Sequence, residues 1–548
     1  MSREVTLIQI GDIHGHLLPR PNLRSDGTGG SEGGLARMFT LIDRVRAEHP
    51  ANLLANTGDT IQGSAEALYT RGQALVEVID RFGVDAYAPG NWDYLYGKER
   101  FLQLFGPGTG GSGNRWGAVA ANAYDAASGD LLLPPRRMVS VGGVRVGIIG
   151  LTTERTLVAL GAWATKGIRF TGDGAEVPGH VAALRQDGAD LVVLVSEFGL
   201  AKNVLIAEHH PGIDVILSSD MHEETHEPVL TTTGTLVSEV GQDGTRLAQL
   251  DLTVGSNGGV REWRYRLHRI DAQLPPDPEI ERLITRLRSP FVDGEGREPH
   301  RNPISEAVLD RPIDETVGRT LIGLHRSNFS HQPVPAVVAG TSSDFLSTAI
   351  REVAATDVAQ FRGFRYGTHV APGPIRLEDL YHFLAVGAQI AWTTVRGEDL
   401  LSNIEASING SLNPDPFAWT GGWIHAYAGV RFTLDPYREK GARALGVQVQ
   451  RYPSSGWEDL LEQAEYRYAG YWFPAEPDRV GGITATGPVK VLREPDGAPR
   501  DVTDVVAEYL ALQVVHAEAG RITLLRPLPE RVGRDPEIQP LAGAHLRS

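Results

Sequence analysis

Short runs of apolar residues that end on polar residues recur through the first half of the chain. Four such runs, rich in Val, Leu and Ile, lie at 5–10, 145–152, 191–195 and 213–217. The run at 5–10 has little polar interruption, which is typical of a β-strand covered on both faces. Apolar residues at helical spacing predict helices at 35–45 and 177–186. The alternation of strands and helices predicts an α/β fold.

Metal-binding side chains follow five predicted strands, namely the runs at 5–10, 191–195 and 213–217 and two shorter strands that precede Asp59 and Asn91. These side chains are Asp12 with His14, Asp59, Asn91, Glu197, and Asp220 with His222. Because ligands in α/β sheets bind beyond the carboxyl ends of the strands, we expect these groups to converge at one rim. A single Asp-x-His is more often a turn in which Asp caps a backbone amide, but five such strand ends favour a metal centre. The run at 145–152 ends without a ligand.

Length, composition and charge narrow the class of protein. With 548 residues, 41% of them apolar and 22% charged, the chain is typical of a globular protein of two or three domains. A formal net charge of −16 leaves no basic surface, so we expect no nucleic-acid or membrane partner. An anionic substrate would need a local positive centre. Cysteine is absent, which excludes disulfides and thiolate ligands.

The sequence also predicts a cellular compartment and domain boundaries. No apolar run approaches the roughly 18 residues of a membrane span, and the N-terminus lacks a signal-type segment. The sequence as it stands predicts a cytoplasmic protein, or a periplasmic one if a signal peptide has been removed. We predict four parts, at 1–270 (catalytic domain), 271–311 (helical linker), 312–525 (second α/β domain) and 526–548 (loose tail).

Two short motifs predict individual structural elements. A turn about Asp243 and Gly244 predicts a hairpin that closes the first domain. In the second domain, the segment TSS predicts the N-cap of a helix at 344–355.

The motifs GDIHGH, TGDT, GNWDY, VSEFG and SSDMHE, in this order, resemble the calcineurin-like metallophosphoesterases. The chain from Leu7 to about Pro436 resembles the 5'-nucleotidase superfamily, which adds a C-terminal substrate-binding domain. The resemblance implies an N-terminal β-sandwich flanked by helices in four layers, followed by a C-terminal α/β domain. It also implies a hydrolase with two divalent metal ions.

The resemblance distributes the ligands between two metal positions. The first would take Asp12, His14, Asp59 and His222, and the second would share Asp59 and add Asn91, Glu197 and Asp220. Glu197 and Asp220 stand where this family has His, so the second position is nearly all oxygen. Hard oxygen ligands favour Mn²⁺, with Fe, Mg or Zn as alternatives. Another alternative is that only one metal ion binds.

Trp92 stands where the family has a catalytic His after its Asn. This Gly-x-Trp motif is similar to the SoxB-type thiosulfohydrolases, in which metal-bound hydroxide releases sulfate from a cysteine S-thiosulfonate. A sulfur leaving group needs less help from an acid than an alkoxide does. The resemblance therefore implies a SoxB-like hydrolase of thiosulfate oxidation.

Further residues are expected to bind the substrate. Arg365 matches the arginine with which the family binds phosphate or sulfonate, and Arg362 lies close by. With Asn91 and Trp92, Arg365 completes the predicted catalytic set. An aromatic patch of Phe417, Trp419 and Trp423 would stack a base, line a channel for a peptide arm, or form plain core. The expected partner is a small anionic substrate or a cysteine-bearing arm of a carrier protein.

Two other functions remain open at this point. One is a 5'-nucleotidase or phosphomonoesterase of nucleotide catabolism that releases phosphate without the His. The other is a metal-binding pseudoenzyme that acts as a partner-binding module.

Overall fold

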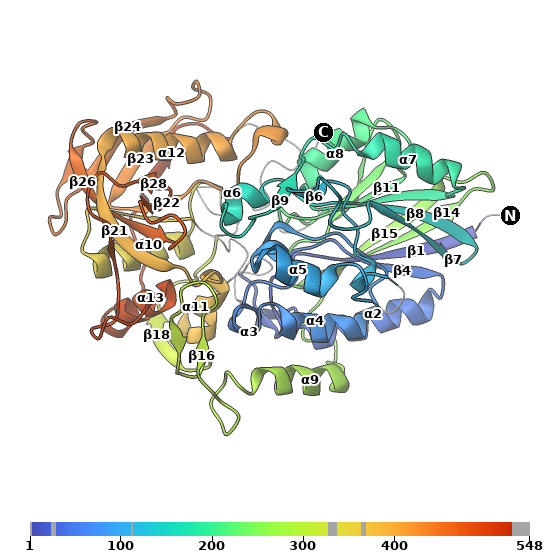
Figure 1. The fold of residues 1–548 in the computed structure, drawn as a ribbon, viewed down its shortest axis with the longest axis horizontal. Helices are drawn as coiled ribbons and strands as arrows, with labels where there is room; N and C mark the ends of the chain where they lie inside the picture. The colour runs from blue at the N-terminus through green and yellow to red at the C-terminus, as the bar shows by residue number, and fades with distance from the viewer. Residues whose placement is uncertain are drawn as a thin grey trace.

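The chain forms two lobes joined side by side (Figure 1). The computed structural model describes residues 3–23, 29–110, 113–326, 337–362, 369–421 and 423–528. Within these ranges, no helix combines the length and the apolar character needed to cross a membrane. Residues 529–548 of the predicted tail lie outside the described part.

The first lobe is built on two β-sheets. The first sheet has the order β15–β14–β1–β4–β5, with the bounds Arg3–Ile10 (β1), Asn52–Asn56 (β4), Ala86–Tyr87 (β5), Arg246–Val254 (β14) and Val260–Arg269 (β15). The second has the order β12–β13–β11–β10–β8–β7, with the bounds Arg136–Val141 (β7), Val144–Leu151 (β8), Leu191–Ser196 (β10), Val215–Ser218 (β11), Val229–Leu230 (β12) and Leu236–Glu239 (β13).

Neighbouring strands in each sheet end at the same edge. β1, β4 and β5 run parallel in the first sheet, and β8, β10 and β11 run parallel in the second. Their carboxyl ends therefore form one rim on each sheet, which is where α/β sheets bind ligands.

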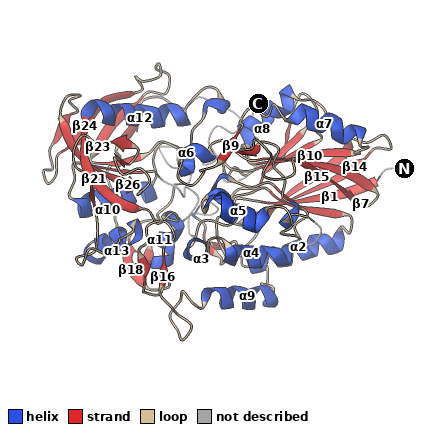
Figure 2. Cartoon of the chain, viewed as in Figure 1, coloured by secondary structure: helices blue, strands red, loops and turns tan. Residues whose placement is uncertain are grey.

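The sheets pack face to face and helices cover their outer faces. Val193 of β10 packs into the core between the sheets, whereas its neighbour Val192 packs against the outer helices. The first sheet is covered by α2 (Leu35–Glu48) and α4 (Gln73–Ile79), and the second by α7 (Val177–Gln186) and α8 (Leu200–His209). Figure 2 shows the resulting helix and strand layers. The four-layer sandwich that the resemblance implies is confirmed, and inner strands such as β10 are apolar on both faces because both faces are covered.

The remaining elements of this lobe and of the connection are short. The helices are α3 (Ala65–Tyr69), α5 (Gly97–Phe105), α6 (Thr156–Leu160) and α9 (Pro278–Arg288). The strand pairs are β2 (Arg20–Pro21) with β3 (Ser31–Glu32), β6 (Ala123–Asp125) with β9 (Ile168–Phe170), and β16 (His300–Arg301) with β17 (Val308–Leu309).

The hairpin predicted about Asp243 and Gly244 is wrong. Both residues have positive φ, 55° and 65°, and form a turn. However, β13 before the turn pairs in the second sheet and β14 after it pairs in the first. The turn therefore carries the chain across the sandwich, and the hairpin of this region is β14–β15.

The second lobe is a second α/β unit, as predicted. Its main sheet has the order β22–β19–β26–β21–β29, with the bounds Val358–Phe361 (β19), Gln389–Arg396 (β21), Ala426–Ala428 (β22), Glu465–Trp472 (β26) and Lys490–Val491 (β29). A smaller sheet has the order β25–β24–β23–β30, with the bounds Val430–Leu434 (β23), Ala444–Gln450 (β24), Trp457–Asp459 (β25) and Ile522–Leu524 (β30). Two strand pairs add β18 (Thr316–Thr320) with β20 (Gly373–Arg376) and β27 (Arg479–Val480) with β28 (Ile483–Thr484).

The α-helices in the described part of this lobe are α10 (Thr341–Ala354), α11 (Leu377–Phe383), α12 (Gly397–Ser411) and α13 (Val502–Leu512). The start of α10 differs from the prediction, because Gly340 takes the N-cap position in extended backbone. The TSS segment that was expected to cap the helix therefore forms its first turn.

Helix α11 joins the two lobes. The hydroxyl of its Tyr381 lies 2.7 Å from the hydroxyl of Tyr69 in the first lobe. Arg288 of α9 pairs with Glu66 at 2.9 Å and with Glu378 of α11 at 2.6 Å. These contacts hold the second lobe over the rim of the first.

Candidate metal centre and interlobe cavity

The predicted ligands lie on loops that leave the two rims. Asp12 and His14 follow β1, Asp59 follows β4, Asn91 follows β5, Glu197 follows β10, and Asp220 and His222 follow β11. Carboxylate oxygens of Asp12, Asp59 and Glu197 all lie within 4.8 Å of one another. Two of these residues come from the first sheet and one from the second, so packing of the sandwich assembles the centre.

Two histidines converge on the same point. Nε2 of His14 lies 2.8 Å from Nε2 of His222, and Oδ1 of Asp12 lies 3.6 Å from each of these nitrogens. Oδ2 of Asp59 lies 3.6 Å from Nε2 of His14. Imidazole nitrogens and carboxylates turned toward a common point form a donor set that suits a divalent transition metal. These four residues fit the first metal position that the resemblance implies.

The ligand loops adopt a backbone conformation that side chains usually avoid. Five predicted ligands have positive φ: Asp12 (46°), His14 (48°), Asp59 (50°), Asp220 (97°) and His222 (63°). Positive φ is uncommon for residues other than glycine and persists only where the surroundings enforce it. Here the amide of Asp12 donates to the carbonyl of Gly58 at 3.0 Å, and that of His14 donates to the carbonyl of Asp59 at 2.8 Å. The strain is concentrated on the residues that face the centre.

Asp93 ties the loop of Asp59 to the loop of Asn91. Its carboxylate accepts hydrogen bonds from the amides of Thr60 and Ile61, at 2.9 and 3.0 Å, and from the hydroxyl of Tyr87 at 2.6 Å. Burial raises the pKa of Asp93, and these hydrogen bonds oppose that shift. Sequence reasoning missed this role, although Asp93 is part of the GNWDY motif.

Glu197 is a buried carboxylate among like charges. It accepts a hydrogen bond from the amide of Asn91 at 3.1 Å. Burial, with the charges of Asp59 and Asp12, raises its pKa well above the ordinary value. Among the described residues, Oε1 of Glu197 and Oδ1 of Asn91 are buried without a hydrogen-bond partner. Such oxygens are suitable ligands for a cation.

Asp220 is engaged differently from the other predicted ligands. Its carboxylate forms an ion pair with the guanidinium of Arg155, which also donates from Nη1 to Sδ of Met221 at 3.0 Å. Arg155 is only 5% exposed. It lies just past β8, the strand at 145–152 whose end offers no metal ligand. The sequence places Arg155 shortly after this predicted strand. An arginine at that position does not match a pattern of metal-binding side chains, so its role was not predicted.

A buried polar network positions the second rim. Asn203 of α8 accepts from the hydroxyl of Ser196 at 2.7 Å and donates to that of Ser218 at 2.8 Å. Ser218 in turn donates to Glu239 at 2.6 Å. Burial raises the pKa of Glu239 to about 7. Since Ser196 and Ser218 end β10 and β11, the network fixes the strand ends that carry Glu197 and Asp220.

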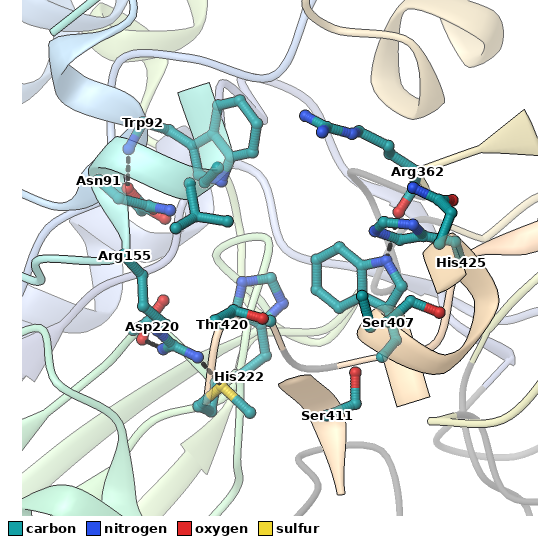
Figure 3. Close-up of a pocket in the computed structure, with 18 residues that line it drawn as sticks. Asn91, Trp92, Arg155, Asp220, His222, Arg362, Ser407, Ser411, Thr420 and His425 are labelled. Atoms are coloured by element: carbon teal, nitrogen blue, oxygen red, sulfur yellow. Dashed lines mark hydrogen bonds and ion pairs between the residues drawn. The ribbon is translucent and has the colours of Figure 1, made fainter. Parts of the chain in front are cut away.

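A cavity of about 230 Å³ lies between the rim and the second lobe. Figure 3 shows Asn91, Trp92, Arg155, Asp220 and His222 on one side of it and Arg362, Ser407, Ser411 and His425 on the other. The cavity is therefore a joint feature of both lobes.

The predicted substrate-binding residues separate into three groups. Arg362 and Trp423 line the cavity, and the indole of Trp423 donates to the carbonyl of Arg362. Phe417 and Trp419 are not among the described lining residues, since Trp419 packs against Ala201 and Met221, and Phe417 packs beside α8. Arg365 lies in 363–368, outside the described residues.

Two family models match the chain. Residues 5–224 match the calcineurin-like phosphoesterase model, and residues 324–480 match the 5'-nucleotidase C-terminal domain. A probable 5'-nucleotidase from Treponema pallidum is 25% identical over 520 residues, which are 85% of this chain and 84% of that protein. The matches to several other curated relatives cover 36% to 41% of the length of those proteins.

Two solved structures share the complete two-lobe fold, and both proteins come from Thermus thermophilus. The sulfate thiohydrolase SoxB has a TM-score of 0.78 at 23% identity, covering 96% of this chain and 98% of that one. A 5'-nucleotidase precursor has a TM-score of 0.78 at 22% identity, covering 96% of this chain and 100% of that one. At such identities, the likeness shows a common fold.

Proposed function

The chain belongs to the calcineurin-like phosphoesterase and 5'-nucleotidase superfamily of metal-dependent hydrolases, and we propose that it releases sulfate from an S-thiosulfonate. In this reaction the S–S bond to the sulfonate group breaks and water supplies a new S–O bond. The products are sulfate and a sulfur anion, and the released protons pass to solvent. Family membership favours this enzyme over a partner-binding pseudoenzyme.

The observation that carries the proposal is the place of Trp92 on the cavity wall. Within the described residues, the wall holds only two histidines, the predicted ligand His222 and His425 of the second lobe. Burial, followed by the charges of Arg362 and Arg326, lowers the pKa of His425 to about 3. Neither the indole of Trp92 nor a neutral His425 supplies an acid to the leaving group near neutral pH.

The missing acid favours a weakly basic leaving group. A thiol has a pKa of about 8.5, whereas an alkoxide is about as basic as hydroxide, whose parent water has a pKa of about 15.7. A sulfur anion can therefore leave without protonation, but a nucleoside alkoxide leaves slowly. This difference favours sulfate release over phosphomonoester hydrolysis.

The proposed metal is Mn²⁺, held by Asp12, His14, Asp59 and His222. A divalent ion at this position supplies an activated water and Lewis-acid stabilisation of substrate oxygens. Carboxylate oxygens are as numerous as imidazole nitrogens in this set, and Glu197 adds a further oxygen nearby. An oxygen-rich set favours Mn²⁺ over Zn²⁺.

The chain's own residues would bind and orient the sulfonate. Arg362 faces the centre from the second lobe, and its Nε is buried without a hydrogen-bond partner among the described residues. A guanidinium donates parallel hydrogen bonds that suit a tetrahedral oxyanion. Trp92 and Trp423 give the cavity apolar walls for the rest of the substrate, which we propose is a small anion or the arm of a cysteine-bearing carrier protein.

The test compares two substrates with the Mn²⁺-supplemented protein. We expect sulfate from an S-thiosulfonated cysteine peptide, measured by ion chromatography, and little phosphate from AMP. The Asp59→Asn variant serves as the inactive control. Phosphate from AMP without sulfate from the peptide would overturn the proposal, and so would release of neither product.

A 5'-nucleotidase is the second candidate. The match to the probable 5'-nucleotidase of Treponema pallidum favours it, because it extends over 85% of this chain. In that case Trp92 and Trp423 would contact the base, and phosphate release from AMP would be the principal activity.

A further inference from the structure

We propose that the guanidinium of Arg155 takes the place of the second metal ion, so that the centre binds one divalent cation per chain. The inference rests on the proposed metal-dependent function and concerns the same centre. It departs from the family pattern, which implies two ions.

The position of Arg155 follows from strand order. β8, β10 and β11 are consecutive parallel neighbours in the second sheet. Their carboxyl ends lead to Arg155, Glu197 and Asp220, respectively. The arginine therefore leaves the same rim as the two carboxylates that the second metal position would require. Figure 3 shows Arg155 in the cavity beside Asn91 and Asp220. Asp59 lines the same cavity.

The carboxylate of Asp220 is already paired with the guanidinium of Arg155. Both side chains are nearly buried, at 6% and 7% exposure, and they form a direct ion pair. A metal ion bound to Asp220 would have to displace this guanidinium or lie beside it as a like charge. Removing one partner of a buried ion pair leaves an uncompensated charge, which is strongly unfavourable. Arg155 therefore competes directly with a second cation.

Asp220 lies outside the groups of side chains that could hold a metal ion. Among the described residues, these groups are Asp12, His14 and His222, and Asp12, Asp59 and Glu197. Asp220 belongs to neither group, although the second metal position requires it. It is instead paired with Arg155.

The residue types near Arg155 agree with the replacement of a metal ion by a guanidinium. The carboxylates Glu197 and Asp220 can pair with a guanidinium, which always carries its positive charge, whereas the neutral histidines of the family pattern would not form such an ion pair. A guanidinium also presents several N–H donors to one anion. Arg155 would therefore bind sulfonate or phosphate oxygens from the first lobe, opposite Arg362 on the second-lobe wall.

Metal stoichiometry tests the inference without an activity measurement. The protein is saturated with Mn²⁺, freed of excess metal, and analysed by mass spectrometry, with electron paramagnetic resonance to detect coupled Mn²⁺ pairs. We expect about one ion per chain and no coupled signal. Two ions with a coupled signal would overturn the inference and leave the proposed hydrolase intact, whereas no bound ion would overturn the proposed function as well.

Two variants sharpen the result. Arg155→Met removes the charge and retains much of the side-chain volume, and we expect its Mn²⁺ content to rise toward two per chain. Arg155→Lys keeps a cation and should remain at one. If folded Arg155→Met also remains at one, Arg155 does not hold the second position. The metal stoichiometry of the wild-type protein tests the inference by itself. The inference can therefore be overturned even if a variant misfolds.

Discussion

The Nε2 atoms of His14 and His222 lie 2.8 Å apart, although 208 residues separate them in the chain. His14 follows the first strand of one sheet, and His222 follows a strand of the other. In this arrangement one imidazole N–H can donate to the nitrogen of the other, or both nitrogens can bind one metal ion. A divalent ion would also balance the two carboxylates of Asp12 and Asp59 beside them.

Replacement of Asp59 by Ala should abolish metal binding. Its Oδ2 lies 3.6 Å from Nε2 of His14, and its Oδ1 is oriented by the amide of Trp92 at 2.8 Å. Titration calorimetry with Mn²⁺ should show at least a 100-fold weaker affinity, in line with the loss of a directly coordinating ligand. Asp130→Ala, at an exposed position, is the matched control and should bind as the wild type does. Unchanged affinity in the Asp59 variant would contradict the ligand assignment.

Replacement of Asp93 by Ala should destabilise the protein by about 3 kcal/mol, because it leaves several buried donors without an acceptor. The affected donors include the amides of Thr60 and Ile61 and the hydroxyl of Tyr87. Urea unfolding of the metal-free protein measures the loss. Asp93→Asn keeps one acceptor oxygen and should lose less. Equal stability of both variants and the wild type would show that Asp93 does not anchor the loops.

Replacement of Trp92 by His should raise phosphomonoester turnover. The imidazole would restore an acid beside the centre, and general acid catalysis contributes about 100-fold or more where geometry is favourable. We expect a smaller increase, of about 10-fold with AMP, because the position of the orienting Asp that the family pattern implies is occupied by Leu95. Trp92→Phe, which opens space without adding an acid, should show no such gain. A gain of equal size in both variants would indicate that space, rather than the acid, limits the reaction.

His425 should make the stability of the protein sensitive to acid. Its pKa of about 3 in the folded state lies below the ordinary value of 6.5, mainly because it is buried. The unfolded chain therefore binds more protons between these two values, and the free energy of unfolding falls as the pH falls from about 6.5 toward 3. The loss should amount to a few kcal/mol, at roughly 1.4 kcal/mol per pH unit.

The His425→Gln variant tests this linkage. It should lose less stability than the wild type when urea unfolding of the metal-free proteins is compared at pH 7, 5 and 4. The nearby charges of Arg362 and Arg326 are common to both proteins. Parallel pH profiles would show that His425 is not responsible.

The sequence predicted the fold well, and the side chains expected at the first metal position lie together in the structure, because the strands and the polar residues at their ends follow local patterns. Strands covered on both faces are continuously apolar, and a polar ligand at the strand end interrupts that pattern visibly. The side on which each strand pairs is not local. The turn at Asp243 and Gly244 has hairpin chemistry, but it joins two different sheets.

Arg155 and the aromatic patch are two further features that local sequence patterns do not predict. The pairing of Arg155 with Asp220 depends on the strand order β11–β10–β8 in the second sheet, which no local sequence pattern predicts. The composition of the patch does not reveal which ring faces a cavity. Trp423 lines it, whereas Trp419 packs against Ala201 and Met221.

The division of the ligands between two sheets couples the centre to the interior of the sandwich. Asp12 and Asp59 follow strands of the first sheet, and Glu197 and His222 follow strands of the second. A cation bound by both sheets acts as a clamp, so its binding free energy also resists their separation. By reciprocity, a change in the layer between the sheets, such as at Val193, weakens the clamp without touching a ligand. The affinity of the centre for a metal ion should therefore depend on how well the two sheets are packed.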